Sequence, residues 1–318
     1  MHSNLMDGLS VNHLRFTVRA KTPIVLTTQP GSAIRGVLYK VLSRNFCSEP
    51  DGPHTQFHTD NCPVCWLLAN SNDRDARGEN QPRPITIQPP VPGRYQPGQT
   101  FTFGISLIGA AQNMLPYIAR AVQRSGETGI GPGRGKFELV TIGEYSPLWD
   151  AQRDLMRDGL VVAPTLQVTS ARVNELATRQ GERVTLEFIT PLRLTANKTL
   201  VKHPNPLPLI QRLVERCQRI ALYYAENPAA YDREQWKTAY NDLSELAQGW
   251  AIVHDETRWV EVHSGSRKKG TTSPISGLTG TVHWSGDISP ALTWLLWGQS
   301  LHVGKSAVKG NGWYRVTW

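Results

Sequence analysis

The sequence predicts an α+β protein made of two tandem domains that share one order of elements. The length of 318 residues exceeds what one small core needs and fits two domains of ordinary size. Each half also ends in the same way, with a helix, a glycine-rich basic loop and a strand. This internal repeat pairs YIARAVQRSGETGIGPGRGKFELV with ALTWLLWGQSLHVGKSAVKGNGWYRV.

The first half opens with the alternating run LRFTVRA at residues 14–20, which is typical of a half-buried strand. An amphipathic helix is expected over residues 32–46, because apolar side chains recur on one face after a serine cap. A Cys/His segment follows, and then a Pro/Gly-rich stretch at 78–98 that we expect to break regular structure. The remaining expected elements are a strand at 101–109, a helix at 110–126 and a strand at 137–145.

The second half repeats this order with one additional helix. Its expected elements are a strand at 183–195, helices at 208–226 and 233–249, strands at 258–266 and 277–286, a helix at 289–299 and the final strand WYRVTW. Both halves thus support the order strand, helix, two strands, helix, strand, which is the ferredoxin-like plan.

The predicted fold class is therefore α+β, with two tandem ferredoxin-like (RRM-like, βαββαβ) domains and a C-terminal glycine-rich loop. The boundary is expected within the polar segment 145–158, which gives an N-terminal domain of residues 1–148 and a C-terminal domain of residues 149–318. One continuous α/β domain with two chance glycine loops is the alternative.

The composition favours a polyanion as partner. The formal net charge is +8 and the pI is about 9.4, and the release of counterions drives basic proteins onto nucleic acid. We expect no membrane span, because no long run is uninterruptedly apolar, and a cytoplasmic location, because the N-terminus lacks the pattern of a signal peptide. Four cysteines in a chain of this length do not indicate a disulfide scaffold.

The run WGQSLHVGKS resembles the phosphate loop of a nucleotide hydrolase, but its spacing does not fit. That loop has four residues between its first glycine and the Gly-Lys-Ser unit, and it follows a strand. Here five residues separate Gly298 from Gly304, Lys305 and Ser306, and little chain remains for the strand that carries a magnesium-binding aspartate. We therefore expect no ATPase activity.

The same run is a candidate for a loop that holds a phosphate group. Glycines allow positive φ and close backbone approach, lysines add charge, and a histidine titrates near neutral pH. His302 is accordingly a candidate general acid or base. The other residues concerned are Gly304, Lys305, Lys309, Gly310 and Gly312. A tight turn with solvated lysines and a packed His302 is the alternative.

A second group of candidates lies in CSEPDGPHTQFHTDNCPVCWLL, which contains Cys47, His54, His58, Cys62 and Cys65. The Cys62-Pro-Val-Cys65 pair has the spacing of a zinc knuckle, and Cys47 with either histidine could complete four ligands. One such pair is half of a zinc signature, so we expect free cysteines and no bound metal. Zinc at Cys47, Cys62 and Cys65 is the alternative.

The two histidines of this segment follow a basic helix on a loop and could equally serve catalysis, with Tyr39 and Lys40 of that helix as proton donors. Basic residues near glycine loops and tryptophans are candidates for contacts with an RNA backbone, although charge runs usually form a solvated face. These residues are Arg35, Arg134, Lys136, Arg267, Lys268 and Lys269.

Over nearly its whole length the chain resembles the CRISPR-associated endoribonucleases of the RAMP superfamily, which cut precursor CRISPR RNA within each repeat. The resemblance rests on AIRGVLYKVL, CPVCWLL, RPITIQPP, PGQTFTFGISLIGAA, GIGPGRGKFELV, EFITPLRL, SGLTGTVHWSG and LHVGKSAVKGNGWYRV. The last run is the most specific, because RAMP proteins carry a C-terminal glycine-rich loop before a final strand.

The resemblance implies two ferredoxin-like domains with a basic cleft and metal-independent cleavage of RNA without a cofactor. A base would take the proton of a 2′-OH, whose attack gives a 2′,3′-cyclic phosphate, while an acid protonates the leaving 5′-oxygen. His302 would be one such group, Lys305 would stabilise the phosphorane charge, and His54 or His58 would act from across the cleft. The expected partners are CRISPR repeat RNA and other subunits of a CRISPR complex.

Two other functions fit the same fold. A RAMP subunit that holds the repeat-derived end of a guide RNA without cutting it would need no titrating group beside the RNA. An RNA-binding protein unrelated to CRISPR would show no preference for a repeat sequence.

Overall fold

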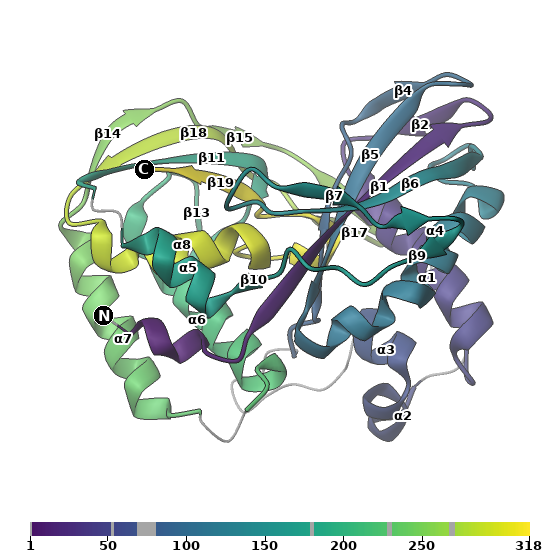
Figure 1. Ribbon diagram of the computed structural model, residues 1–318. Coiled ribbons are helices and arrows are strands. Elements are labelled where there is room, and N and C mark those ends of the chain that lie inside the picture. The colour runs from purple at the N-terminus through teal and green to yellow at the C-terminus, as the bar shows by residue number, and fades with distance from the viewer. Residues whose placement is uncertain (1, 52–53, 69–80, 179–180, 228–230, 267–270) are drawn as a thin grey trace. The chain divides into compact units, whose positions relative to one another are not determined.

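The computed structural model describes residues 2–51, 54–68, 81–178, 181–227, 231–266 and 271–318 (Figure 1). Its internal contacts divide the chain into two compact units. The N-terminal unit consists of residues 12–146 and 150–167, and the C-terminal unit of residues 1–11, 147–149 and 168–318. The domain boundary between residues 148 and 149 stays a prediction.

The N-terminal unit has an antiparallel sheet in the order β3-β5-β1-β6-β7. Its strands are β1 (Ser10–Ala20), β3 (Ile85–Gln88), β5 (Thr100–Ile108), β6 (Phe137–Tyr145) and β7 (Gln152–Asp154). Without the short β7, the four strands lie in the order second, third, first, fourth along the chain. This is the order of a ferredoxin-like sheet, in which the last strand pairs beside the first.

Two helices pack against each other in this unit, α1 (Pro30–Phe46) and α4 (Leu115–Thr128). Helix α1 buries Ile34, Leu38 and Leu42, which lie on the face predicted from the sequence. The expected helix at 110–126 starts as the 3-10 segment η2 (Gly109–Met114), and α4 begins only at Leu115. Proline at the first turn explains this start, because it lacks the N–H that a helix interior requires.

The smaller elements of this unit are α2 (Gln56–Asn61), α3 (Pro63–Leu68), the pair β2 (Ile24–Leu26) and β4 (Gly93–Tyr95), and the pair β8 (Met156–Arg157) and β9 (Leu160–Val161). The expectation that residues 78–98 contain no regular structure was wrong, because β3 and β4 lie within that stretch. Strand β3 is at the edge of the sheet, where the prolines on either side of it cost no ladder hydrogen bond.

The C-terminal unit repeats the topology with the sheet order β14-β18-β11-β19. These strands are β14 (Ala251–Asp255), β18 (Gly277–Ser285), β11 (Arg183–Leu192) and β19 (Tyr314–Thr317), with β15 (Arg258–Val260) paired to β18. The second strand of this plan is thus β14 and not the stretch 258–266. Its five residues are all exposed, so no buried face marked it in the sequence.

Helices α6 (Pro206–Tyr224) and α8 (Ser289–Leu301) pack together, and α7 (Arg233–Gln248) packs on α6. Every residue of α8 from Ala291 to Leu301 is buried, which makes it the central helix of this unit. The remaining elements are η1 (Ser3–Met6), β10 (Val168–Thr169), α5 (Ser170–Ala177), β12 (Leu194–Ala196), β13 (Thr199–Val201), β16 (His263–Ser266), β17 (Thr271–Pro274) and η4 (Ala307–Lys309).

The predicted fold class of two tandem ferredoxin-like domains is therefore confirmed. None of the helices in the described ranges is both long and apolar enough to cross a membrane.

Glu144 on β6 ties the segment after β9 to the sheet of the N-terminal unit. Its carboxylate is 2% exposed, accepts hydrogen bonds from the N–H groups of Thr165 (2.6 Å) and Leu166 (2.8 Å), and pairs with Arg153 at 2.9 Å. A buried carboxylate with this many charge-assisted partners is stabilising as long as all of them are present.

We expect Glu144→Gln to lower the free energy of unfolding by about 2–3 kcal/mol, because the amide loses the charge and turns a donor toward these N–H groups. Urea denaturation followed by circular dichroism measures the change. Glu138→Gln is the control, since Glu138 lies on the same strand but is partly exposed and pairs with the surface cations Arg19 and Lys21. Equal losses for the two variants would contradict the anchoring role.

Candidate functional site

The predicted catalytic and metal-binding residues lie in two places, one in each unit. The loop between α8 and β19 carries the glycine and lysine candidates of the C-terminal unit. The segment from the end of α1 through α3 carries the cysteine and histidine candidates of the N-terminal unit.

The loop after α8 follows a helix, which agrees with the exclusion of a nucleotide-hydrolase loop, since that loop follows a strand. Its backbone is anchored to the unit by hydrogen bonds from Val303 N to Gly312 O (3.0 Å), from Lys305 N to Arg193 O (3.1 Å) and from Gly312 N to Pro191 O (3.1 Å). These N–H groups are therefore engaged within the protein. The loop is a well-anchored turn from which side chains project.

Within this loop the candidates differ in exposure. Lys305 is exposed and Lys309 and Gly304 are partly exposed, whereas Gly310 and Gly312 are buried. The glycines have positive φ, and a Cβ at Gly312 would collide with the carbonyl oxygen of Val303. The RNA contacts of these residues stay predictions, and Lys305 is the one whose side chain is open to a ligand.

His302 is 0% exposed, and its ring lies nearly parallel to Trp313 with centroids 6.3 Å apart. Its backbone has φ 57° and ψ 159°, a conformation that non-glycine residues rarely adopt. A ring buried in this way meets a phosphate only if the loop moves. The acid–base role of His302 stays a prediction, and in this structure the residue packs the loop against the unit.

The positive φ of His302 predicts that the backbone is strained at this residue, and two substitutions test this. We expect His302→Gly to be more stable than His302→Ala by about 1–2 kcal/mol, because both variants lose the ring but only glycine adopts this φ without a Cβ penalty. Urea denaturation of the two variants measures the difference. Lys237 in α7 is the matched control, since glycine there should be about 1 kcal/mol less stable than alanine. The same sign at both positions would contradict the strain.

In the N-terminal unit the chain brings four buried side chains together, those of Cys47, His58, Cys62 and Cys65. Their ligand atoms all lie within 4.8 Å of one another. His58 Nε2 is 3.3 Å from Cys47 Sγ and 3.4 Å from Cys65 Sγ, and the two sulfurs are 3.9 Å apart. Cys47 directly follows α1 as its C-cap, His58 lies in α2 rather than on the loop expected from sequence, and Cys65 lies in α3.

Burial raises the pKa of the Cys47 thiol, and burial together with the neighbouring Cys62 raises the pKa of the Cys65 thiol. Without a positively charged partner, these buried thiols therefore favour the protonated form. The cysteines are free of disulfides, as expected from the sequence.

His54 and Tyr39 lie beside this cluster. The ring of His54 stacks on His58 with centroids 4.6 Å apart and an interplanar angle of 13°, and its Nε2 is 2.6 Å from the Glu49 carbonyl oxygen. Tyr39 of α1 is partly exposed, and burial, followed by Cys65 and Cys47, raises its pKa. Tyr39, His54 and His58 thus all lie near the same cysteines, and His54 is the more exposed of the two histidines.

Arg35 has a structural partner. It donates to the Leu68 carbonyl oxygen at 2.5 Å, and Arg83, which the sequence did not single out, donates to the Trp66 carbonyl oxygen at 3.2 Å. Both acceptors are at the C-terminal end of α3, where a helix leaves carbonyl groups without intrahelical partners. These arginines therefore hold α3 in place, and an RNA contact of Arg35 stays a prediction.

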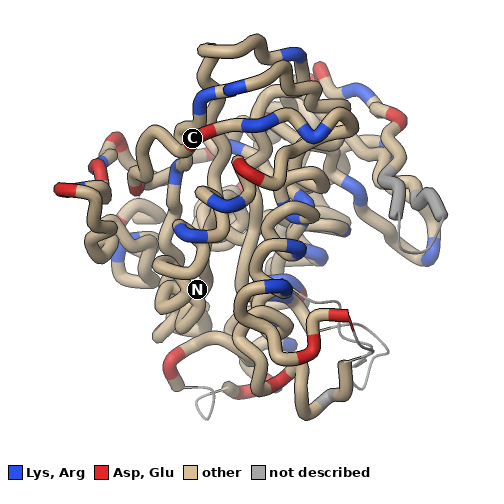
Figure 2. Tube along the Cα trace, turned by 90° about the vertical axis from the view of Figure 1, so that its right-hand side faces the viewer, with Lys and Arg blue, Asp and Glu red and all other residues tan. Residues whose placement is uncertain are grey.

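The other basic candidates are less constrained. Arg134 is exposed with φ 49°, and the Lys136 ammonium donates to the Glu127 carbonyl oxygen. Arg267, Lys268 and Lys269 lie outside the described residues. In Figure 2 the Lys and Arg positions of the described residues are spread over many elements.

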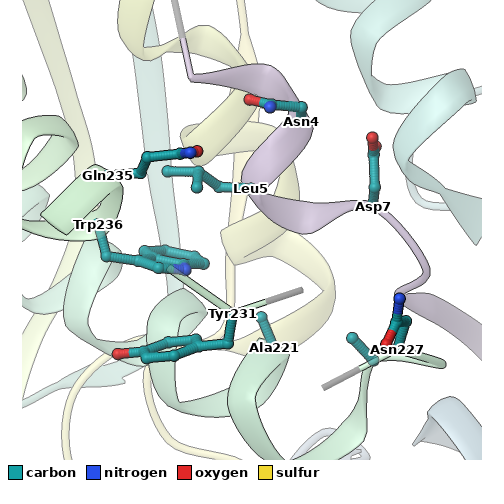
Figure 3. Close-up of a pocket in the computed structure, with 9 residues that line it drawn as sticks. Asn4, Leu5, Asp7, Ala221, Asn227, Tyr231, Gln235 and Trp236 are labelled. Carbon is teal, nitrogen blue, oxygen red and sulfur yellow. The ribbon is translucent and has the colours of Figure 1, made fainter. Parts of the chain in front are cut away.

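A pocket of about 280 Å³ opens in the C-terminal unit beside η1 (Figure 3). Tyr231 and Trp236 stack on one side of it with ring centroids 6.4 Å apart, and Leu5 and Gln235 lie near them. The described residues that line it include the carboxylate of Asp7 but no lysine or arginine. Its lining therefore does not suit a phosphate backbone.

Solved structures share this architecture. A Cas6 product complex matches 96% of this chain and 100% of its own, at 15% identity and a TM-score of 0.58. Thermus thermophilus Cas6 matches 97% of this chain and 99% of its own, at 16% identity and a TM-score of 0.55. In a partial Cas6-RT-Cas1–Cas2 complex, the match covers 98% of this chain and 46% of the other, at 15% identity and a TM-score of 0.59. The chain is thus a tandem ferredoxin-like protein.

The sequence comparison gives two matches to family models. Residues 186–314 match the model of the CRISPR-associated endoribonuclease Cas6 family, and residues 9–166 match a family described as an N-terminal domain. None of the curated proteins matches the chain. The C-terminal part of the chain is therefore similar to the Cas6 endoribonuclease family, in agreement with the resemblance to CRISPR-associated endoribonucleases seen in the sequence.

Sequence reasoning did not distinguish His58 from His54 as the histidine that lies among the cysteines. The run His58-x₃-Cys62 places two ligands one helical turn apart, and Cys65 follows after the two residues typical of metal knuckles. This spacing was a usable signal for His58 over His54. Glu49, whose Oε1 lies 3.4 Å from His58 Nδ1, carries no signal in the sequence.

Proposed function

We propose that this protein is an endoribonuclease that cleaves CRISPR precursor RNA within its repeats to give guide RNAs. The observation that carries the proposal is the match of residues 186–314 to the Cas6 endoribonuclease family. The ferredoxin-like fold and the net charge of +8 support it, because a basic protein gains affinity for RNA from counterion release.

The reaction proposed is metal-independent transesterification. A base removes the proton of the 2′-OH next to the scissile phosphate, and the resulting oxygen attacks phosphorus. The bond from phosphorus to the 5′-oxygen breaks, and an acid protonates that oxygen. The products are a 2′,3′-cyclic phosphate and a 5′-hydroxyl end, and no net proton is consumed.

His54 is the acid–base group that we propose, with Tyr39 in support. Of the two histidines beside Tyr39, His54 is the more exposed, whereas His58 turns its Nε2 toward two buried sulfurs. We propose Lys305 for the stabilisation of phosphorane charge, because its ammonium extends from an anchored loop into solvent. His302, the acid–base candidate from the sequence, has a buried ring and is the alternative to His54.

Cleavage of a labelled repeat RNA from the organism's own CRISPR array, in EDTA, tests the acid–base assignment. We expect the wild type to cut once per repeat and to leave a cyclic phosphate. His54→Ala should bind RNA normally but cut about 10²–10⁴-fold more slowly, as expected for loss of a general acid or base. His254→Ala, at an exposed histidine of β14, is the matched control and should cut at the wild-type rate.

The outcomes separate the candidate roles. If His302→Ala binds but fails to cut while His54→Ala cuts normally, the catalytic histidine is His302 and the proposal for His54 is wrong. Tight repeat binding with no cleavage by the wild type would instead identify a RAMP subunit that holds RNA without cutting it.

Lys305→Ala should reduce the rate of cleavage about 10²-fold or more if its ammonium stabilises the phosphorane, with a smaller effect on affinity for the uncleaved RNA. Single-turnover cleavage and filter binding measure the two effects separately. Lys237→Ala is the matched control, because Lys237 is an exposed lysine on α7. A loss of affinity with an unchanged rate would make Lys305 a binding residue only.

A further inference from the structure

We propose that Cys47, His58, Cys62 and Cys65 form a structural zinc site in the N-terminal unit. All four side chains are buried, and their ligand atoms converge within 4.8 Å of one another. Three sulfurs and one imidazole nitrogen make a Cys₃His set, which is a common ligand set of structural zinc. The proposal takes up the zinc alternative, in place of the expectation of free cysteines without metal.

The distances fit a tetrahedral ion. With Zn–S bonds of about 2.3 Å and a Zn–N bond of about 2.0–2.1 Å, a tetrahedron separates two sulfurs by about 3.8 Å and a sulfur from the nitrogen by about 3.5 Å. The Cys47 and Cys65 sulfurs are 3.9 Å apart, and His58 Nε2 is 3.3 and 3.4 Å from them. Cys47, His58 and Cys65 therefore have the spacing of ligands in a zinc coordination shell, and the Cys62 sulfur lies within 4.8 Å of each of them.

Glu49 supplies a second, independent indication. Its Oε1 lies 3.4 Å from His58 Nδ1, while the other ring nitrogen faces the sulfurs. A histidine that binds zinc commonly gives its second N–H to a carboxylate, which fixes the tautomer and the ring orientation. His58 is therefore oriented as a ligand, and Nε2 is the atom that it offers.

The site would hold together elements that have little stability of their own. Helices α2 and α3 have six residues each, too few for a helix to persist in water without tertiary support. The proposed ligands come from the end of α1, from α2 and from α3, which lie together in the N-terminal unit (Figure 1). A site closed by four protein ligands has no open position for substrate, so its role is structural.

His54 is the competing ligand. Its ring nitrogens lie 3.6–3.9 Å from the sulfurs of Cys47 and Cys65, but its Nε2 faces the Glu49 carbonyl oxygen at 2.6 Å and its side chain is more exposed. The zinc site thus uses His58 and leaves His54 for proton transfer. A disulfide between Cys47 and Cys65 is the competing covalent state, because their sulfurs are close enough to join on oxidation.

The test is the metal content of the untagged full-length protein, purified under reducing conditions and dialysed against metal-free buffer. Mass spectrometry with an inductively coupled plasma should find about one zinc per chain and little iron. Cys65→Ala should lose the zinc. Cys217→Ala is the matched control and should keep it, since Cys217 is also a buried free cysteine but lies in α6 of the other unit.

Two further variants identify the histidine. His58→Ala should lose zinc and His54→Ala should keep it, and the reverse result would overturn the assignment of His58. Glu49→Gln should bind zinc about 10–100-fold more weakly in competition with a chelator, as expected for a carboxylate that orients a ligand. Glu49 is about half exposed, so its replacement should leave the fold intact.

A variant that loses zinc could simply have failed to fold. A spectroscopic measurement on the wild-type protein avoids this ambiguity. Replacement of the ion by cobalt(II) should give the visible absorption of a tetrahedral site, with charge-transfer bands from sulfur. Wild-type protein from zinc-supplemented cultures that holds no zinc, or a Cys47–Cys65 disulfide as its main form, would overturn the proposal. Metal content is read without RNA, so this result does not depend on whether the protein cleaves repeats.

Discussion

The pairing of the last strand with the first closes the sheet of each unit, and the other elements depend on this long-range contact. In the N-terminal unit β6 runs antiparallel to β1 from Leu14 and Glu144 to Ala20 and Phe137. In the C-terminal unit β19 pairs with β11, with Phe188 opposite Tyr314. The Tyr314 hydroxyl also donates to the Leu295 carbonyl oxygen, which ties β19 to α8. Each glycine loop exists because the chain must reverse sharply between the second helix and this closing strand.

The sequence predicted this architecture because its strongest signals are local. The faces of α1 and α6 and the paired endings of the two halves follow from periodicity and from glycine. The two strands placed wrongly are both sheet edges. Strand β3 lies among prolines with every residue buried, and β14 is exposed throughout, so neither shows the alternation that identifies a strand. Their pairing is decided by tertiary contacts.

The sequence identified which residues make up the candidate sites, but it did not predict how their side chains are arranged. The segment after α1 was recognised as rich in cysteine and histidine, yet the roles of its two histidines depend on which ring nitrogen meets which sulfur. Likewise, the sequence left open whether His302 faces a ligand or packs within a tight turn, and the structure buries its ring beside Trp313. Such burial follows from the fold of the whole unit and leaves no trace in local residue spacing.

The exposed edge strand β14 could pair with a strand of another molecule at high protein concentration. It is long enough to template another strand, and Ile252 and Val253 are exposed on it. Its register with β18 shifts between Ile252 and His254, which bends the edge and interrupts a regular ladder. Two polar side chains, His254 and Asp255, follow directly. An irregularity of this kind is one of the features by which edge strands avoid pairing with the edge of another sheet.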